Sequence, residues 1–504
     1  MASISTTATA GRTGFEGVSI PFVIGASSAG TVIEWYDFYL YALLTPFLAP
    51  LFFPAENPTT SLLSGFAVYG AGFAVRPFGA LVFGRIGDVI GRKYAFLLTV
   101  SIMGGATFIV GLLPTYAQIG ILAPAILVLL RLLQGLALGG EYGGAAIYVA
   151  EHAPDGKRGL YTSWIQTTAT VGMFAALGLI LITRLSFGDQ TYAAWGWRVP
   201  FLISIILVAG ALYIRFRLQE TPLFQLLKIR GRTATNTSGW AKDSFGGNKV
   251  GIILLVLIGM TAGQAVVWYQ GQFQALFFLT TLLKVSFVPA YTILLIAIAL
   301  ATPFFIVFGW LSDKIGRKVI ILGGCAIAAI TYVPIYQAMV ANANVTMDQA
   351  GKIASANPNM PVMIALVWIQ IVYVTMVYGP IAAFLVEYFP ARIRYTSLSI
   401  PYHLGNGEFG GWLPFIQTGI VAATVVGAGF VPWFGVFDLR FLNPGGDPNG
   451  QLYAGLIYTI TVAVITVIVG GLFIPETKDR KIWEEVHSIE ERSVGAAGAA
   501  SVAD

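Results

Sequence analysis

Long apolar stretches that are almost free of charge dominate this chain, and they constrain its fold more than any other feature. Charged residues make up 11% of the 504 residues and apolar residues 56%, whereas a soluble domain carries about 25% charged residues. A soluble fold of this length would have too few charges to cover its surface. The sequence therefore predicts an all-α membrane protein, in which the lipid bilayer replaces water around most of the chain.

Twelve segments are long and apolar enough to cross a bilayer. A membrane-spanning helix needs about 20 predominantly apolar residues. The first, fourth, seventh and eleventh segments exceed that length, so we expect them to be tilted, kinked or interrupted. The predicted spans are residues 22–52, 62–84, 94–114, 122–149, 160–183, 198–217, 249–280, 287–310, 318–340, 360–386, 396–430 and 451–474.

The placement of Lys and Arg predicts the orientation of these spans. Of the 29 basic residues, 22 lie on the side that holds both termini and every second loop, and 5 lie on the other side. The remaining two, Arg76 and Arg131, lie inside predicted spans. Because Lys and Arg are enriched in cytoplasmic loops, we expect both termini in the cytoplasm. The net charge of +5 then marks topology and does not indicate nucleic-acid binding.

Polar segments divide the chain into five predicted parts. The segment between the sixth and seventh spans is rich in Lys, Arg, Ser, Thr, Asn and Gly and reads as a flexible linker. Two outer loops, 341–360 and 431–451, are long, and an outer lid is the only role that we suggest for them. The parts are a disordered cytoplasmic N-terminal tail (1–20), an N-terminal six-helix bundle (21–217), a cytoplasmic linker (218–248), a C-terminal six-helix bundle (249–475) and a cytoplasmic C-terminal tail (476–504).

An internal repeat relates the two predicted bundles. FGRIGDVIGRK begins at Phe83 and FGWLSDKIGRK begins at Phe308, so their shared residues are offset by 225 positions. AEHAPDGKRGLYTS from Ala150 pairs in the same way with VEYFPARIRYTS from Val386, and QETP pairs more weakly with PETK. Two similar six-helix halves with a binding site at their interface are typical of secondary transporters. The repeat therefore predicts two pseudo-symmetric bundles.

Several motifs resemble those of known families. G-x-x-x-D-x-x-G-R-K after the second span resembles the hallmark of the major facilitator superfamily, and R-x-x-Q-G at Arg131 resembles a second superfamily motif. EWYDFYLY from Glu34, FAVRPFGA from Phe73 and LGGEYGGAAIYVAEHAP from Leu138 resemble the metabolite:proton symporter branch. That branch includes carriers of α-ketoglutarate, citrate, shikimate and proline or betaine. The resemblance covers about residues 20–485 and implies the major facilitator fold and alternating access.

The resemblance also implies a role for the duplicated loops. The loop around Asp88 is expected to latch the two halves on the cytoplasmic side and to favour the outward-open state. Asp and Arg are four residues apart in each copy, so each pair can meet on one helix turn. An ordinary basic turn that only sets topology is the alternative. The expected latch residues are Gly84, Asp88, Gly91, Arg92, Asp313 and Arg317.

Ionisable residues inside the predicted spans are the candidates for proton coupling. A charge at mid-bilayer costs about 2.5–3.5 kcal/mol on insertion scales, so we expect these side chains to face the bundle interior and to pair. Burial disfavours the charged form of a carboxylate, which allows such a group to load and release a proton. Ion pairs that only fix helix packing are the alternative. The candidates are Glu34, Asp37, Arg131 and Glu141, and the resemblance supports Arg131.

The predicted substrate site combines an arginine with polar and aromatic side chains of the spans. Arg76 would stay charged and could fork onto a carboxylate, and Gly263 and Gly271 would allow the seventh span to bend. An aromatic side chain in a span can instead pack against a neighbour or sit at the interface. The substrate candidates are Arg76, Gln166, Gln264, Trp268, Tyr269, Tyr378, Asn406 and Glu408.

The sequence excludes several other classes of protein. One cysteine and three histidines form neither a disulfide framework nor a metal-binding spacing. No GxxxxGK[ST] loop is present, so we do not expect ATP to drive the protein. We expect no enzyme and no cofactor, but a monomeric proton-coupled importer of a small carboxylate in a bacterial inner membrane. A carrier of a zwitterion or of a sugar is the alternative. A non-transporting sensor should have lost the carboxylates and the latch, and a channel would not need the duplicated loops.

Overall fold

The computed structural model describes residues 20–89, 92–140, 142–217, 246–390, 394–425, 443 and 445–482. Gly91 and Glu141 lie outside the described residues. For Glu34, Gly84, Asp88 and Arg92 the structure describes only the backbone. The predicted roles of these six residues therefore stay predictions.

Helices make up nearly all of the described chain. Before the predicted linker they are α1 (Ile20–Phe52), α2 (Pro58–Ala74), α3 (Arg76–Val89), α4 (Arg92–Leu112), α5 (Tyr116–Ile119), α6 (Leu122–Leu138), α7 (Tyr142–His152), α8 (Arg158–Ala194), η1 (Gly196–Arg198) and α9 (Val199–Arg217). After it they are α12 (Lys249–Val256), η2 (Leu257–Thr261), α13 (Ala262–Tyr269), η3 (Gln270–Gln274), α14 (Ala275–Phe277), η4 (Phe278–Leu282), α15 (Phe287–Ala301), α16 (Pro303–Ile315), α17 (Arg317–Ala341), α18 (Met360–Tyr378), α19 (Ile381–Tyr388), α20 (Arg394–Leu404), η5 (Gly405–Gly411), α21 (Leu413–Ala423) and α22 (Leu456–Phe473).

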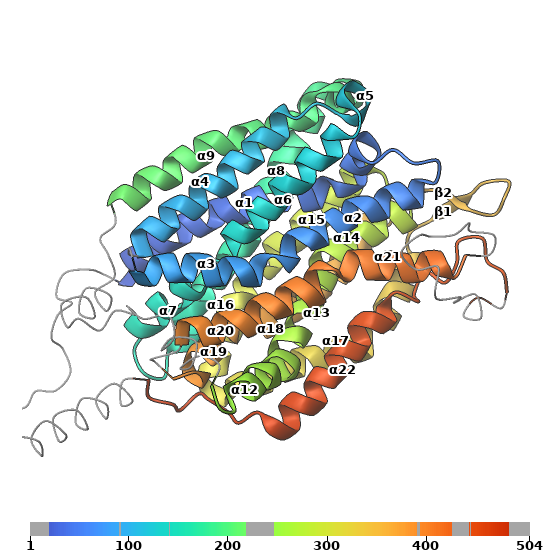
Figure 1. Cartoon of the computed structure of the whole chain (residues 1–504). Helices are drawn as coiled ribbons and strands as arrows, with labels where there is room; N and C mark the ends of the chain where they lie inside the picture. The colour runs from blue at the N-terminus through green and yellow to red at the C-terminus, as the bar shows by residue number, and fades with distance from the viewer. Residues whose placement is uncertain are drawn as a thin grey trace, which may run out of the picture.

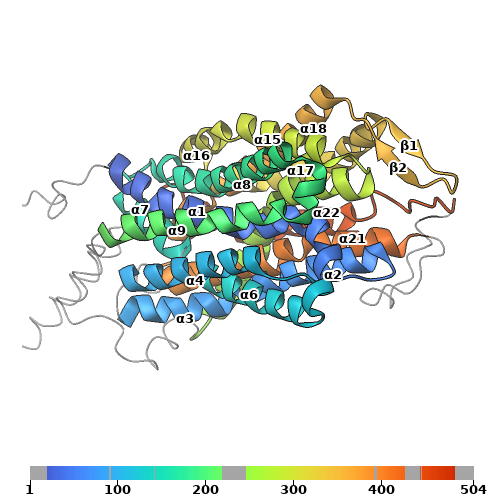
Figure 2. The same cartoon turned by 90° about the horizontal axis from the view of Figure 1, so that it is seen from above.

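The long helices run side by side along one direction, so the connections gather at two ends of the molecule (Figures 1 and 2). One end carries the junction of α16 and α17, and we call it the latch end. The other end carries a hairpin of two antiparallel strands, β1 (Val345–Met347) and β2 (Ile353–Ala356), and we call it the hairpin end. The hairpin lies in the predicted outer loop 341–360.

Nine helical stretches of the described chain are long and apolar enough to cross a membrane. They begin at residues 58, 122, 158, 196, 249, 287, 317, 360 and 456, close to nine of the predicted spans. The helices α1, α4 and α20–η5–α21 occupy the other three predicted positions. The eleventh span was expected to reach residue 430, but its last described helix ends at Ala423.

A proline interrupts the second predicted span beside Arg76. Pro77 has no N–H group and cannot continue the hydrogen-bonding pattern of the preceding helix. Accordingly α2 ends at Ala74 and α3 begins at Arg76. The arginine therefore lies at a helix break in the middle of the span.

Close packing at a glycine holds this break against the fourth span. Gly139 lies between α6 and α7, and a Cβ atom on it would lie 2.0 Å from the carbonyl oxygen of Arg76. Only glycine permits this approach between the two backbones. The interruption expected in the fourth span is thus confirmed, since α6 ends before Gly139 and α7 begins after it. The contact at Gly139 fixes the depth of Arg76 in the bundle.

The seventh and eleventh spans are interrupted as expected, but by π-helical turns. The seventh contains η2, η3 and η4, and the eleventh contains η5, whose sequence is GNGEFGG. Such turns occur frequently at functional sites. Gly271 lies within η3, but Gly263 lies in the regular helix α13, where a Cβ atom would lie 2.6 Å from Thr466. Gly263 therefore permits close contact with the last helix.

Candidate functional site

A buried arginine in an aromatic cage forms the centre of the candidate site. The guanidinium carbon of Arg76 lies 4.8 Å from the ring centre of Phe73, 5.6 Å from that of Trp35 and 5.9 Å from that of Phe38. The rings belong to α1 and α2, and Arg76 itself is 0% exposed. Aromatic faces attract a cation, so they stabilise the guanidinium without satisfying its hydrogen bonds.

The Arg76 guanidinium has no hydrogen-bond acceptor in the described part of the chain. Its Nε, Nη1 and Nη2 atoms are all buried and unpartnered there. Holding an ion in a low-dielectric interior without a partner costs several kcal/mol. The pairing that we expected for Arg76 is therefore wrong among these residues. The group is arranged as a buried site for an acceptor that is not part of the described chain.

The second half of the chain supplies the facing wall of this site. Arg76 lies within electrostatic reach of Tyr269, Tyr378, Tyr402 and His403. These residues come from α13, α18 and α20, which follow the predicted linker. The arginine is thus buried where residues of both halves meet.

Indole and phenol rings close the interface between the two halves beside Arg76. The ring centre of Trp268 in α13 lies 6.4 Å from that of Trp35 and 5.8 Å from that of Tyr39, and both of these residues belong to α1. The indole N–H of Trp268 and the hydroxyl of Tyr39 are buried without a partner among the described residues. Trp268 and Tyr269, which were expected to contact substrate, therefore do lie beside Arg76.

A chain of tyrosines lies on the latch side of the same interface. The rings of Tyr142 in α7 and Tyr402 in α20 stack at 3.6 Å with an interplanar angle of 3°. Gln166 donates to the Tyr142 hydroxyl at 2.6 Å, and the hydroxyls of Tyr378 and Tyr402 lie 2.8 Å apart. Two predicted substrate residues, Gln166 and Tyr378, are thus joined through two tyrosines that sequence reasoning missed.

The other predicted substrate residues are engaged elsewhere. The amides of Gln264 and Asn406 bond to each other, with both N–O distances at 3.3 Å. Glu408 is half-buried on η5 beside Trp412 and Tyr458. Glu408 was expected to join the site, but no described contact links it to Arg76.

Asp37 and Arg131 are buried in the first half and do not pair with each other. Asp37 is 1% exposed, and neither of its carboxylate oxygens has a partner among the described residues. Arg131 donates from Nη1 to Gln134 at 2.6 Å, and Gln134 donates to Thr107 at 2.7 Å. The arginine also lies 4.5 Å from the ring centre of Tyr41. The expected pairing of a carboxylate with an arginine was wrong here, because sequence spacing gives the depth of a side chain but not its neighbour.

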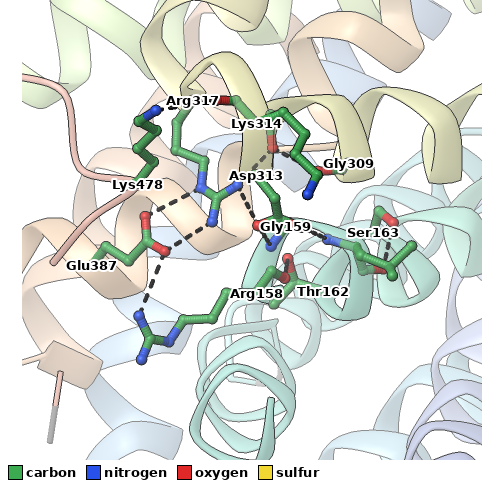
Figure 3. A network of polar contacts seen from close by, with 12 residues as sticks. Arg158, Gly159, Thr162, Ser163, Gly309, Asp313, Lys314, Arg317, Glu387 and Lys478 are labelled. Atoms are coloured by element: carbon green, nitrogen blue, oxygen red, sulfur yellow. Dashed lines mark hydrogen bonds and ion pairs between the residues drawn. The ribbon is translucent and has the colours of Figure 1, made fainter. Parts of the chain in front are cut away.

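A second polar site joins the two halves at the latch end. Asp313, at the end of α16, accepts hydrogen bonds from the backbone N–H groups of Gly159 at 2.9 Å and Leu160 at 2.8 Å (Figure 3). Both amides belong to the first turn of α8, where helix N–H groups are unpaired and the helix dipole attracts an anion. The carboxylate of one half thus caps a helix of the other half.

Arg317 holds this carboxylate in place. Its guanidinium lies 2.7 Å from Asp313 and also donates to both oxygens of Glu387, at 3.0 and 3.2 Å (Figure 3). Asp313 and Arg317 do meet, but across the junction of α16 and α17 and not on one helix turn as expected, because Gly316 between the two helices has a φ angle of 116°. Glu387 was not predicted, although it occupies the same place in VEYFP as Glu151 does in AEHAP. We call Asp313, Arg317 and Glu387 the latch cluster.

The segment after the last helix completes the latch cluster. Glu476 accepts from the backbone N–H groups of Arg317 at 2.8 Å and Lys318 at 3.0 Å, which caps the start of α17. Thr477 donates to Glu387 at 2.9 Å. Arg158 of the first half donates to the backbone oxygen of Arg480 at 2.8 Å. The PETK motif therefore has a structural role as a helix cap.

Comparison with known proteins identifies the family. Residues 22–250 match the family described as "Sugar (and other) transporter". The chain is 34% identical to the α-ketoglutarate permease of Escherichia coli (strain K12), over 78% of this chain and 85% of that protein. It is 32% identical to the citrate-proton symporter of Klebsiella pneumoniae, over 79% and 84% of the two chains. The proline/betaine transporter of Salmonella typhimurium is also 32% identical, over 76% and 74%.

The chain belongs to the metabolite:proton symporter family of the major facilitator superfamily. Solved structures agree with this family at the level of the fold. The D-xylose-proton symporter has a TM-score of 0.65 at 19% identity, over 92% of this chain and all of that one. A proton:xylose symporter bound to 6-bromo-6-deoxy-D-glucose has a TM-score of 0.68 at 17% identity, over 93% and 98%. The transporter thus has the major facilitator fold that its motifs predicted.

This symporter-family protein is closed at both ends in the described structure. At the hairpin end, Phe66 of α2 in the first half packs against Phe277 of α14 in the second, with ring centres 4.7 Å apart. The Tyr291 hydroxyl of the second half donates to the Leu43 carbonyl of the first. At the latch end, the latch cluster joins the halves. The inner residue Arg76 is fully buried between these closures. Arg76 is therefore shut off from both ends of the described structure.

Proposed function

We propose that the protein is a proton-coupled symporter that imports a small carboxylate metabolite by alternating access, and that the carboxylate binds Arg76. One observation carries this proposal: the Arg76 guanidinium is fully buried with all three nitrogens unpartnered among the described residues. A guanidinium presents a rigid fork that matches a carboxylate in two parallel hydrogen bonds. An anionic substrate would supply the missing acceptors.

The surroundings of Arg76 favour a substrate that contacts both halves. Trp35 and Phe38 come from the first half, whereas Tyr378 and His403 come from the second. A carboxylate held by Arg76 would place the rest of a small metabolite against the second half. Binding would then favour the occluded state, because only that state offers both sets of contacts.

Asp37 is the proposed proton carrier. Its carboxylate is buried without a partner among the described residues, whereas Arg131 in the same half is already bonded to Gln134. An unpaired carboxylate in an apolar interior is costly, so a proton would neutralise it. Glu34, Glu141 and Arg131 remain further candidates for the proton path.

The proposed topology is twelve spans in two six-helix halves, 21–217 and 249–475, joined by the linker 218–248. The repeated motifs and the latch cluster support this division, since Asp313 of the second half caps α8 of the first. The basic residues support a cytoplasmic latch end and cytoplasmic termini. We propose a monomer in a bacterial inner membrane.

A zwitterion carrier is the second candidate, and the aromatic cluster favours it. The ring centres of Trp35, Tyr39 and Trp268 lie 6.4 Å or less from one another in each of the three pairs. Aromatic cages recognise quaternary ammonium groups through cation–π attraction. A zwitterion could place its carboxylate on Arg76 and its ammonium against these rings.

Binding and uptake measurements on purified protein test these proposals. A ligand stabilises the state to which it binds, so thermal unfolding in the presence of α-ketoglutarate, citrate, glycine betaine and xylose should show the largest stabilisation with the carboxylates. Arg76→Lys keeps the charge but loses the fork, and Arg76→Gln loses both. Carboxylate affinity should fall about tenfold or more in Arg76→Lys and further in Arg76→Gln. Unchanged affinity in both variants would rule out Arg76 as the site.

Uptake into proteoliposomes tests the coupling. Wild-type protein should accumulate the carboxylate only when a proton gradient is imposed. Asp37→Asn should abolish this accumulation and spare exchange across the membrane without a gradient. Wild-type accumulation by Asp37→Asn would contradict its assigned role.

A further inference from the structure

A cavity of about 630 Å³ lies at the hairpin end, between the two halves. Its walls come from the ends of α1 and α2 in the first half, and from η4, α21 and the β1–β2 hairpin in the second half. This volume falls in the range of small-molecule sites, about 300–1,000 Å³. Beyond it, Phe66 and Phe277 pack together and separate it from the buried interior.

Two lysines supply the only charges on the cavity wall in the described part of the chain. Lys284 and Lys352 line the cavity, and no acidic residue does. Asp447, which neighbours the wall, already accepts hydrogen bonds from the backbone and the side chain of Asn449. Other basic residues at this end are engaged: Arg184 pairs with Asp189, and Arg198 donates to backbone carbonyls. Two further acidic residues lie next to the wall without lining it: Asp348 accepts from the backbone N–H of Lys352 at 2.8 Å, and Glu56 lies between the wall residues Ala55 and Pro58. Among the described residues that line it, the cavity therefore carries only positive charge.

Lys284 is held in a backbone conformation that favours glycine. Its φ angle is 56°, directly after η4. The amides of Leu283 and Val285 on either side donate back to Phe278 and Leu279, as at a left-handed helix end where glycine is usual. A side chain in this conformation is strained, because its Cβ atom lies too close to the following carbonyl oxygen. Such strain occurs at ligand-binding sites, where the side chain has a use that offsets its cost.

The surroundings of Lys284 add to this cost. Partial burial lowers the pKa of the Lys284 ammonium, because its charged form loses part of its hydration. A bound anion would restore the lost stabilisation.

The wall that carries Lys352 is a defined structure. Asn449 accepts from the Ile353 N–H at 2.8 Å and donates to the Gly351 carbonyl at 3.0 Å. These bonds tie the β1–β2 hairpin to the turn before α22. Lys352 lies between the two anchored residues, so its backbone position over the cavity is fixed.

We propose that this cavity, the outer vestibule, is a docking site for small organic dianions, which wait there before they enter the Arg76 site. Two ammonium groups without a carboxylate match a dicarboxylate, whereas a zwitterion without net charge would gain little. The vestibule rests on the proposed carboxylate transport for its purpose, but its binding of dianions does not require Arg76. The vestibule would raise the local concentration of substrate next to the packed rings of Phe66 and Phe277.

Chemical labelling tests the site directly. Purified transporter is treated with an amine-acetylating reagent, and modification of Lys284, Lys352 and Lys157 is followed by mass spectrometry. Lys157 is exposed at the latch end and serves as the internal reference. α-Ketoglutarate should slow acetylation of Lys284 and Lys352 severalfold and leave Lys157 unchanged, and glycine betaine should protect none of them.

The same labelling in Arg76→Gln separates the two proposals. Protection that persists in this variant supports a vestibule independent of the inner site. Absence of protection, or protection that disappears with Arg76, overturns the vestibule. If the vestibule is protected but Arg76→Gln transports with wild-type affinity, the proposed role of Arg76 fails alone.

Transport kinetics of a double variant, which combines Lys284→Gly and Lys352→Gln, provide a second test. The double variant should lower kcat/KM for α-ketoglutarate about tenfold at low ionic strength and leave kcat unchanged. The difference should shrink at high salt, because salt screens the attraction. Lys157→Gln, which removes the same charge at the other end, should behave like wild type.

Stability of Lys284→Gly distinguishes a binding role from a packing role. Glycine adopts the observed φ without strain, so the midpoint of thermal unfolding should not fall. A lower midpoint together with unchanged kcat/KM would overturn the proposal, since it would show that Lys284 serves only to hold the fold.

Discussion

The two ends of the transporter are closed by different chemistry. At the latch end, Asp313 accepts two amide hydrogen bonds across the halves, and Arg317 pairs with both buried carboxylates. At the hairpin end, the described residues join the halves through ring contacts, the cation–π contact of Arg184 with Phe287 and the hydrogen bond from Tyr291 to Leu43. Charge-assisted hydrogen bonds are strong and directional, whereas apolar contacts tolerate sliding. From this difference we expect the latch end to open as a switch and the hairpin end by graded separation.

The largest effect should come from removing the cation of the latch cluster. Arg317→Met leaves Asp313 and Glu387 buried without this partner, and loss of one member of a buried pair costs about 3–5 kcal/mol. We expect a clear fall in the midpoint of thermal unfolding. Arg184→Met, which removes the ion pair with the exposed Asp189 and the cation–π contact with Phe287 at the hairpin end, is the control and should change stability by only about 1–2 kcal/mol. Equal effects would refute the contrast between the ends.

An intermediate effect should follow from neutralising the cap across the halves. Asp313→Asn weakens its bonds to the amides of Gly159 and Leu160, which are worth about 1.5–3 kcal/mol when one partner is charged. The population should shift toward a state open at the latch end. Spin labels at Lys157 and Lys314, both exposed, should report a longer mean distance, in a Cys325→Ser background. An unchanged distance distribution would remove Asp313 from the latch.

The smallest effect should come from the hairpin end. Tyr291→Phe removes the hydroxyl that donates to Leu43 and keeps the ring, so the loss should be about 0.5–1.5 kcal/mol. Substrate should then reach the interior more readily from this end, with a modest rise in the exchange rate. Labels at Lys157 and Lys314 should not move, and a movement there would show that the two closures are not separate.

The pairing of Asp313 with Arg317 was predictable because its motif is repeated. Asp313 and Arg317 were found by their offset from Asp88 and Arg92, but the turn at Gly316 between α16 and α17 is what brings them together. Their partners Glu387 and Glu476 lie 70 and 159 residues from Arg317, and a single sequence contains no signal for that proximity. The repeat placed both residues in paired motifs but did not say what they touch.

The inner site was predictable in depth but not in pairing. The cost of an intramembrane charge pointed to Asp37, Arg76 and Arg131, and all three are buried. Which face of its helix each side chain occupies depends on breaks such as that at Pro77, which shift the helical register. The stacked pair Tyr142 and Tyr402 is formed by residues 260 positions apart and had no distinguishing mark among 22 tyrosines.

The strap that follows α22 has a practical consequence. Glu476, Thr477 and Arg480 bind the start of α17, Glu387 and Arg158, so this short stretch touches the groups that keep one face shut. A fusion tag or antibody attached just after Ile482 would pull on that stretch. Protein used for measuring transport rates should therefore carry such attachments at the N-terminus. A C-terminal attachment can be tested separately for its effect on the transport rate.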